Sequence, residues 1–332
     1  MRGQQALYKL PLCSCTRGRT PCNTSHQITK LLHHREAGSL PLLKGSELGV
    51  YDLAVARLCP PIRTPNLYYH ICSHDNGRLC ISSPTLRSIV FYAPHAEGVL
   101  TFQELVIEDV PCLERLLLIY PDSSPTTIQV IRDPKLEILG SLSEQISTLH
   151  LGKPLLQKMI AVSLTTKMHS MKILVLDSMG PNLGVLVDFL KCFPCLEKLY
   201  VILNRHKDVN YVWKHGPLDP VRCLELHLKK VVLKNYNGDR RAFTNLAKFF
   251  ILNAKVLKEM EIGFFQIGNE EWVCCQHRQL QVENRASQGA RIELKDDMDL
   301  KFTDRVHTHN FSIADPFDRS LCGCSKCVRE PF

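Results

Sequence analysis

The sequence predicts an α/β fold in which short strands and their return segments stack into an irregular, horseshoe-like solenoid. Two observations favour this fold class. A leucine-containing phrase recurs along most of the chain, and its last copies are joined by an apolar stretch of helical spacing at 243–250. A strand that feeds a helix and returns to a neighbouring strand cannot bury its apolar face alone, so such units must stack on one another.

The repeated phrase supplies one strand per unit. It reads SPTLRSIVFY at 83–92, VPCLERLLLIY at 110–120, DPKLEILGSL at 133–142, HSMKILVLDSM at 169–179 and FPCLEKLYVIL at 193–203, with degenerate copies from 221 and 254. Aligning its first leucine-type residue gives positions 86, 113, 136, 171, 196, 224 and 257. The spacings of 27, 23, 35, 25, 28 and 33 residues lie mostly near a leucine-rich-repeat period. The long intervals predict loops or extra turns near 140–168 and 203–220.

Proline marks where each return segment closes. It stands just before four phrases, at Pro84, Pro111, Pro134 and Pro194. Because proline disfavours helix at the preceding residue and cannot donate to a strand ladder, the preceding segment must end there.

Two return segments have the apolar spacing of helices that cover the convex face. The apolar positions are Leu183, Leu186, Val187, Phe189 and Leu190 in the first, and Phe243, Leu246, Phe249 and Phe250 in the second. Asp239 is the expected N-cap of the second helix, and Asn253 its end. Alternation of Leu224, Leu226 and Leu228 predicts a strand just before it.

Composition indicates a folded chain whose main partner is not nucleic acid. The net charge is +8, from 41 basic and 33 acidic residues. Residues 1–35 contain no acid and hold six of the basic residues, namely Arg2, Lys9, Arg17, Arg19, Lys30 and Arg35. The remainder is nearly neutral and offers no concentrated basic face for phosphates. The acid-free start reads as a disordered tail rather than an organelle transit peptide.

Cysteine usage favours a reducing compartment, the cytoplasm or the nucleus. The chain has 15 cysteines, an odd number, and several lie within apolar segments where free cysteine packs as a small hydrophobe. No apolar run reaches the ~18 residues needed to span a bilayer, so no membrane partner is expected.

Several stretches of the sequence resemble a known family. PCLEKLYV and the stretch from 221 to 262 resemble the FBD domain that follows leucine-rich repeats in plant F-box proteins, in the form found in grasses. The residues that carry the resemblance are Cys223, Leu228, Lys229, Lys230, Val231, Leu233, Tyr236, Gly238, Asn253, Ala254, Val256, Leu257 and Met260. RLCISSPTLRSIVFY resembles the family's repeats, and FSIADPFDRS at 311–320 resembles its C-terminal tail.

Composition and the resemblance together predict four regions. They are a basic tail at 1–35, irregular leucine-rich repeats at 36–220, an FBD segment at 221–264 that continues the repeats, and a helix, strand and Cys-containing tail at 265–332.

The resemblance also implies a function, the substrate-receptor part of a cullin-based ubiquitin ligase. In such a receptor an F-box grips a Skp-type adaptor and the repeats hold a protein target. Nothing in residues 1–60 matches an F-box, so we expect neither adaptor nor cullin to be recovered with these residues. The alternative is a repeat-only binding protein or regulator not coupled to ubiquitination.

Candidate contact residues gather around the FBD segment. They are Lys229, Lys230, Lys234, Arg240 and Arg241, with Tyr211 and Trp213 in the preceding loop. The basic residues either meet an acidic partner or form a solvated face, and the aromatics either anchor an interface or plug the core.

No arrangement of residues indicates catalysis. There is no Gly-rich phosphate loop, paired catalytic carboxylate or serine nucleophile elbow, so we expect no enzyme activity and no cofactor. The nearest to a metal site is the set His307, His309, Cys322, Cys324 and Cys327, whose spacing does not fit two zinc knuckles, so no metal is expected. Adjacent Cys274 and Cys275 are expected on a helix, one buried and one half-buried.

Overall fold

The structure is a computed structural model of the chain. It describes residues 47–51, 55–58, 66–70, 78–92, 104–118, 127–132, 135–144, 146–152, 155–158, 160–161, 166–179, 183–204, 220–264, 268–296 and 314–318. The predicted tail at 1–35 and most of the predicted loop at 203–220 lie outside these ranges.

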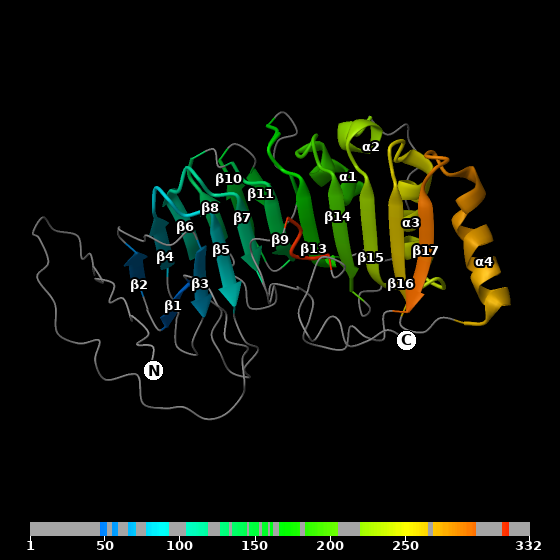
Figure 1. Cartoon of the computed structure of the whole chain (residues 1–332), viewed down its shortest axis with the longest axis horizontal. Helices are drawn as coiled ribbons and strands as arrows, with labels where there is room; N and C mark the ends of the chain where they lie inside the picture. The colour runs from blue at the N-terminus through cyan, green and yellow to red at the C-terminus, as the bar shows by residue number, and fades with distance from the viewer. Residues whose placement is uncertain are drawn as a thin grey trace, which may run out of the picture.

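A ten-stranded parallel sheet, here called the large sheet, runs along the molecule (Figure 1). Its strands lie side by side in chain order: β1 (Glu47–Tyr51), β3 (Asn66–His70), β5 (Ser88–Tyr92), β7 (Arg115–Leu118), β9 (Ile138–Leu142), β13 (Ile173–Met179), β14 (Lys198–Leu203), β15 (Lys230–Tyr236), β16 (Glu259–Phe264) and β17 (Arg291–Asp296). Every phrase from 83 to 203 contributes its predicted strand. The α/β repeat fold is therefore confirmed.

Behind the first half of the large sheet lies a second sheet of seven strands. Its parallel strands are β2 (Val55–Leu58), β4 (Arg78–Ser82), β6 (Glu104–Asp109), β8 (Thr127–Val130) and β10 (Thr148–Leu151), followed by antiparallel β11 (Leu155–Gln157) and β12 (Ile160–Ala161). Of the loop or extra turns expected at 140–168, a simple loop is wrong, because three of these strands lie in that interval. Burial alternates along β8 and β10, which is the period of a strand.

Behind the second half, helices replace these strands. They are α1 (Leu183–Lys191), α2 (Arg222–Leu226), α3 (Arg241–Asn253) and α4 (Glu270–Leu280), the last followed by the 3₁₀ turn η3 (Val282–Asn284). All apolar side chains predicted for the helices at 183–190 and 243–250 are buried. The end of α3 at Asn253 is confirmed as well, and its side-chain amide donates to the carbonyl of Phe249 at 2.8 Å.

Two local predictions around the FBD segment are wrong. Residues 222–226 form α2 rather than a strand, since Cys223 and Leu224 are buried while Leu226 is 55% exposed. Consequently Leu228, not Leu224, is the repeat leucine, because it precedes β15 by two residues as Leu196 precedes β14. The N-cap of α3 is Arg240, not Asp239, and it makes no side-chain cap hydrogen bond.

A repeated corner links the coils just before each strand of the large sheet. The carbonyl of Glu114 accepts hydrogen bonds from the backbone N–H groups of Glu137 and Ile138. The same double acceptance occurs at Arg87, Glu137, Lys172, Glu197 and Lys229. Ion pairs join corner side chains of neighbouring coils, in the pairs Arg87–Glu114, Glu137–Lys172 and Glu197–Lys229. These exposed pairs add little stability, so the corner is held mainly by the backbone.

One continuous apolar core fills the space behind the large sheet, from Leu79 in β4 to Ala290 before β17. Among the residues described, no helix is long and apolar enough to cross a membrane.

Candidate functional site: the outer face of the large sheet

The large sheet has a second apolar surface on its outer face, which points away from the second sheet and the helices. Side chains alternate along each strand, so Leu199 and Val201 enter the main core while Tyr200 belongs to a separate cluster. The other members of this outer cluster are Val90, Leu117, Ile138, Ile173, Val175, Val232 and Phe317. These outer-face side chains are buried, at 0–6% exposure.

The character of the outer face changes along the sheet. The register aligns one row of residues across eight strands: Ser88, Arg115, Ile138, Ile173, Lys198, Lys230, Glu259 and Arg291. A row two residues further on contains Val175, Tyr200, Val232, Glu261 and Glu293. The face is mainly apolar up to β13, mixed on β14 and β15, and charged on β16 and β17.

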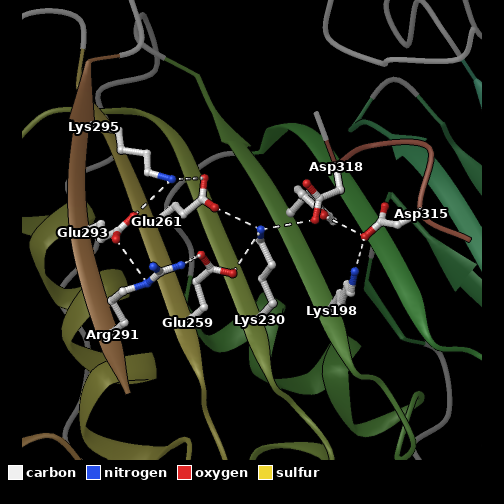
Figure 2. Close-up of polar contacts among 10 residues, drawn as sticks. Lys198, Lys230, Glu259, Glu261, Arg291, Glu293, Lys295, Asp315 and Asp318 are labelled. Atoms are coloured by element: carbon white, nitrogen blue, oxygen red, sulfur yellow. Dashed lines mark hydrogen bonds and ion pairs between the residues drawn. The ribbon is translucent and has the colours of Figure 1, made fainter. Parts of the chain in front are cut away.

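A segment from the C-terminal region, Ala314–Asp318, lies on the mixed part of this face and is here called the tail segment (Figure 2). Asp315 is 1% exposed, and one of its carboxylate oxygens accepts from the Lys198 ammonium at 2.6 Å and from the Tyr200 hydroxyl at 2.9 Å. Its other oxygen accepts from the backbone N–H of Phe317 at 3.1 Å. Charge-assisted hydrogen bonds to a buried carboxylate are strong, so Asp315 anchors the segment.

Phe317 provides the apolar half of the contact. Its ring lies 5.7 Å from the ring of Tyr200, tilted by 42°, and its side chain is 6% exposed. Among the described residues it is the one member of the outer cluster that comes from outside the large sheet. Burying a Phe side chain is worth about 1.5–3 kcal/mol, which is comparable to the contribution of the carboxylate anchor.

Tyr200 is positioned as a permanent donor to Asp315. Burial raises the pKa of the Tyr200 hydroxyl far above its ordinary value of 10.0, and the nearby Asp315 carboxylate adds to the shift. The hydroxyl therefore keeps its proton, which it donates to the carboxylate.

Lys230 is the junction between the tail segment and the charged end of the face. Its ammonium lies 3.2 Å from Glu259, 2.9 Å from Glu261 and 3.5 Å from Asp318. Burial by itself would lower the pKa of Lys230, but the hydrogen bond to Glu261 and the surrounding carboxylates outweigh burial and raise it above 10.5. This lysine is therefore charged throughout the neutral range.

Beyond Lys230 the charged side chains of β16 and β17 pair with one another (Figure 2). Arg291 lies 2.6 Å from Glu259 and 3.1 Å from Glu293, while Lys295 lies 3.2 Å from Glu261. Burial alone would raise the pKa of Glu259, but Arg291 and Lys230 hold it below its ordinary value of 4.5. This end of the face is a closed network of ion pairs along the last strands of the sheet.

The structure divides the predicted basic cluster. Lys230 lies on the outer face, and exposed Lys229 lies at the corner beside it, where it pairs with Glu197 at 2.7 Å. Lys234 is half-buried in β15, pairing in register with Ile202. Arg240 and Arg241 stand past the far end of β15, and the Arg240 guanidinium lies 5.6 Å from the Phe243 ring. Tyr211 and Trp213 lie outside the described residues.

Sequence reasoning missed Lys198, Tyr200, Asp315 and Phe317 as a site. The alternation of Lys198 and Tyr200 in a predicted strand indicates that they share a face, but Asp315 follows Lys198 by 117 residues. No local pattern relates the two segments.

Cysteine and metal predictions have mixed outcomes. Cys274 and Cys275 lie on α4 as expected, but both are exposed, so the predicted burial is wrong because the helix places its buried side at Gln276 and Leu280. Within the part of the chain that the structure describes, no group of His, Cys, Asp or Glu could hold a metal ion. His307, His309, Cys322, Cys324 and Cys327 lie outside that part.

Repeated parallel strands, each preceded by the same corner, are the architecture of a leucine-rich-repeat protein. Comparison with family models supports this directly. Residues 57–201 match the model described as FBD-associated F-box protein At5g56370, LRR repeats, and residues 216–262 match the model described as FBD. Over these residues the chain is similar to the leucine-rich repeats and the FBD region of FBD-associated F-box proteins. No curated protein and no solved structure matches it.

Proposed function

We propose that this chain holds a protein target on the outer face of the large sheet, as the target-binding part of a ubiquitin-ligase substrate receptor. The supporting observation is the tail segment, a stretch of polypeptide held on that face by two ion pairs, a tyrosine hydroxyl and a buried aromatic ring. A face that holds one polypeptide segment has the chemistry to hold another. The family match supports a protein-interaction role.

The proposal includes the overall geometry. The stacked coils form a horseshoe-like solenoid, and the outer face lines its concave side, where repeat proteins of this type present extended binding surfaces. Rigid strands hold Lys198, Tyr200 and Lys230 in fixed register, which lowers the entropic cost of binding.

The test maps target binding onto the two sides of the molecule. A photo-crosslinking residue replaces Glu293 on the outer face, and a matched one replaces Arg278 on the exposed side of α4. The target captured through position 293 is then purified. Its affinity is measured for the unmodified chain and for the Lys230→Glu and Arg278→Glu variants. We expect about tenfold or greater weakening from Lys230→Glu alone, as for loss of a partly buried charge pair. Equal binding by the two variants contradicts the proposal.

The proteins recovered together with this target distinguish a ligase substrate receptor from a binding protein that is not coupled to ubiquitination. Recovery of a Skp-type adaptor and cullin together with the target supports the substrate receptor. Recovery of the target without them favours a binding protein or regulator that is not coupled to ubiquitination.

A further inference from the structure

We propose that the outer-face site on β14 and β15 recognises a peptide of the form Asp-x-Phe-Asp in a target protein, and that the tail segment is an internal competitor for it. This rests on the proposed function and adds the ligand's chemistry and its regulation. The sequence Asp315-Pro316-Phe317-Asp318 is seated in that site within the chain.

Recognition of the first acid is the most demanding contact. The Asp315 carboxylate is almost fully buried between the Lys198 ammonium and the Tyr200 hydroxyl, at 2.6 and 2.9 Å. An amide or apolar side chain at this position would leave the partly buried Lys198 without its counter-charge. The site therefore selects a carboxylate at the first position.

The aromatic position is selected by the apolar part of the face. Phe317 joins seven large-sheet side chains in one cluster, and its neighbours Tyr200 and Val232 stand on the same two strands as the cations. One residue, Pro316, separates the first acid from the ring, and the carboxylate of Asp315 accepts from the N–H of Phe317, which fixes the turn between them. The spacing of the motif is thus set by both the peptide and the site.

The last acid faces Lys230 at a longer distance, 3.5 Å, and its side chain is 14% exposed. Past this contact stand Glu259 and Glu261, both already paired with cations of β17 or with Lys230 itself. Additional acidic residues there would meet carboxylates rather than free cations. A ligand with a longer acidic run therefore gains nothing on this side.

Occupation by the tail segment makes binding in trans a competition. A segment tethered in the same chain acts at an effective concentration in the millimolar range, far above that of most targets. A target peptide binds fully only when it displaces the tail segment, so weakening the tail segment exposes the site.

The experiment uses the full chain and a fluorescent peptide with the sequence of residues 312–320, SIADPFDRS. In the variant Asp315→Ala/Phe317→Ala the site is vacated, and we expect it to bind the peptide at least about tenfold more tightly than the unmodified chain does. Adding Lys198→Met to that variant should abolish binding, whereas Lys172→Met, at an exposed corner, should leave it unchanged. A peptide with Asn and Ala at the positions of Asp315 and Phe317 should not bind.

Two results would overturn the inference: no peptide binding by the vacated variant, or equal binding of the altered peptide. If the vacated variant still binds the target captured through position 293 but not the peptide, the motif is wrong and the proposed function stands. If the vacated variant binds neither the target nor the peptide, both the motif and the proposed function are wrong. Should the double variant fail to fold by circular dichroism, Asp318→Asn is tested instead. It removes the most peripheral contact, so we expect a gain of about threefold, and no gain counts against the inference.

Discussion

Replacing Lys230 with Met removes the cation that joins the tail segment to the charged end of the outer face. The methionine keeps the apolar stem, so the change isolates the charge. Lys230 is 13% exposed, and its three partners Glu259, Glu261 and Asp318 are 23%, 21% and 14% exposed. The substitution therefore leaves carboxylates in a partly desolvated place with one cation fewer.

The expected loss lies between two reference cases. Removing one partner of a fully buried ion pair costs about 3–5 kcal/mol, whereas an exposed pair contributes about 0–1 kcal/mol. Glu259 keeps Arg291 and Glu261 keeps Lys295, so most of the carboxylate charge stays compensated. We expect the free energy of unfolding to fall by about 2 kcal/mol in the Lys230→Met variant.

The assay is chemical denaturation of the wild type, of Lys230→Met and of the matched control Lys229→Met. The m value should be the same for all three. Lys229 is 46% exposed and pairs with Glu197, so its replacement should cost about 0–0.5 kcal/mol. Equal losses at the two neighbouring lysines would refute the reasoning, because the outer-face network would then add nothing.

The pH dependence of that difference has a definite sign. The folded pKa of Glu259 is lowered, so its contribution is present above pH 4.5 and is lost as pH falls through the folded value. The folded pKa of Lys230 is raised, so its contribution is present below pH 10.5 and is lost as pH rises through the folded value. The stability gap between wild type and Lys230→Met should therefore be widest between these limits and close at either end. A gap that is unchanged in acid contradicts the ion-pair explanation.

Two further predictions concern the FBD segment and its neighbours. A Cβ at Gly238 would lie 2.8 Å from the side-chain carbon Cδ of buried Gln276, so Gly238→Ala should lower the free energy of unfolding by about 1–3 kcal/mol. Gly289→Ala has nothing within 4 Å of the new carbon and should be nearly neutral by the same denaturation assay, and equal effects would contradict the clash. Burial raises the pKa of the Cys223 thiol to about 12, so at pH 8 in the native chain it should resist alkylation while exposed Cys275 reacts. Peptide mapping by mass spectrometry measures the extent of alkylation at Cys223 and at Cys275. Equal alkylation would show that Cys223 is not buried.

The repeated leucine phrase predicted the strands of the large sheet between residues 83 and 203. Prediction failed where a short segment fits both the apolar spacing of a strand and that of a helix. Leu224, Leu226 and Leu228 alternate as in a strand, yet Leu224 and Leu228 also stand four apart, as on one face of a helix. Short apolar runs do not decide between these periods. The neighbouring coil decides, since the N–H groups of Lys229 and Lys230 bond to the carbonyl of Glu197 and fix where β15 begins.

The second sheet escaped prediction for a related reason. Its described strands are two to six residues long, and their half-buried positions carry polar side chains such as Thr127 and Gln129. Each strand gains its stability from the coil before and after it rather than from its own sequence. The sequence predicts a helix and a strand within 265–332, and α4 and β17 lie there, but β17 lacks the leucine phrase and its position is specified by pairing with β16.

The position of the tail segment follows from the graded character of the outer face. Phe317 needs an apolar surface and Asp315 needs a cation. The apolar end of the outer face would satisfy only Phe317, and the charged end would satisfy only Asp315. On β16 the acids Glu259 and Glu261 are compensated within the sheet, whereas the described ion pair of Lys198 is with Asp315 from outside it. β14 and β15 thus combine an apolar surface with cations that accept carboxylates from elsewhere in the chain. Specificity for an acidic–aromatic segment therefore resides at this boundary, and single changes at Lys198 or Tyr200 should alter it more than changes at either end.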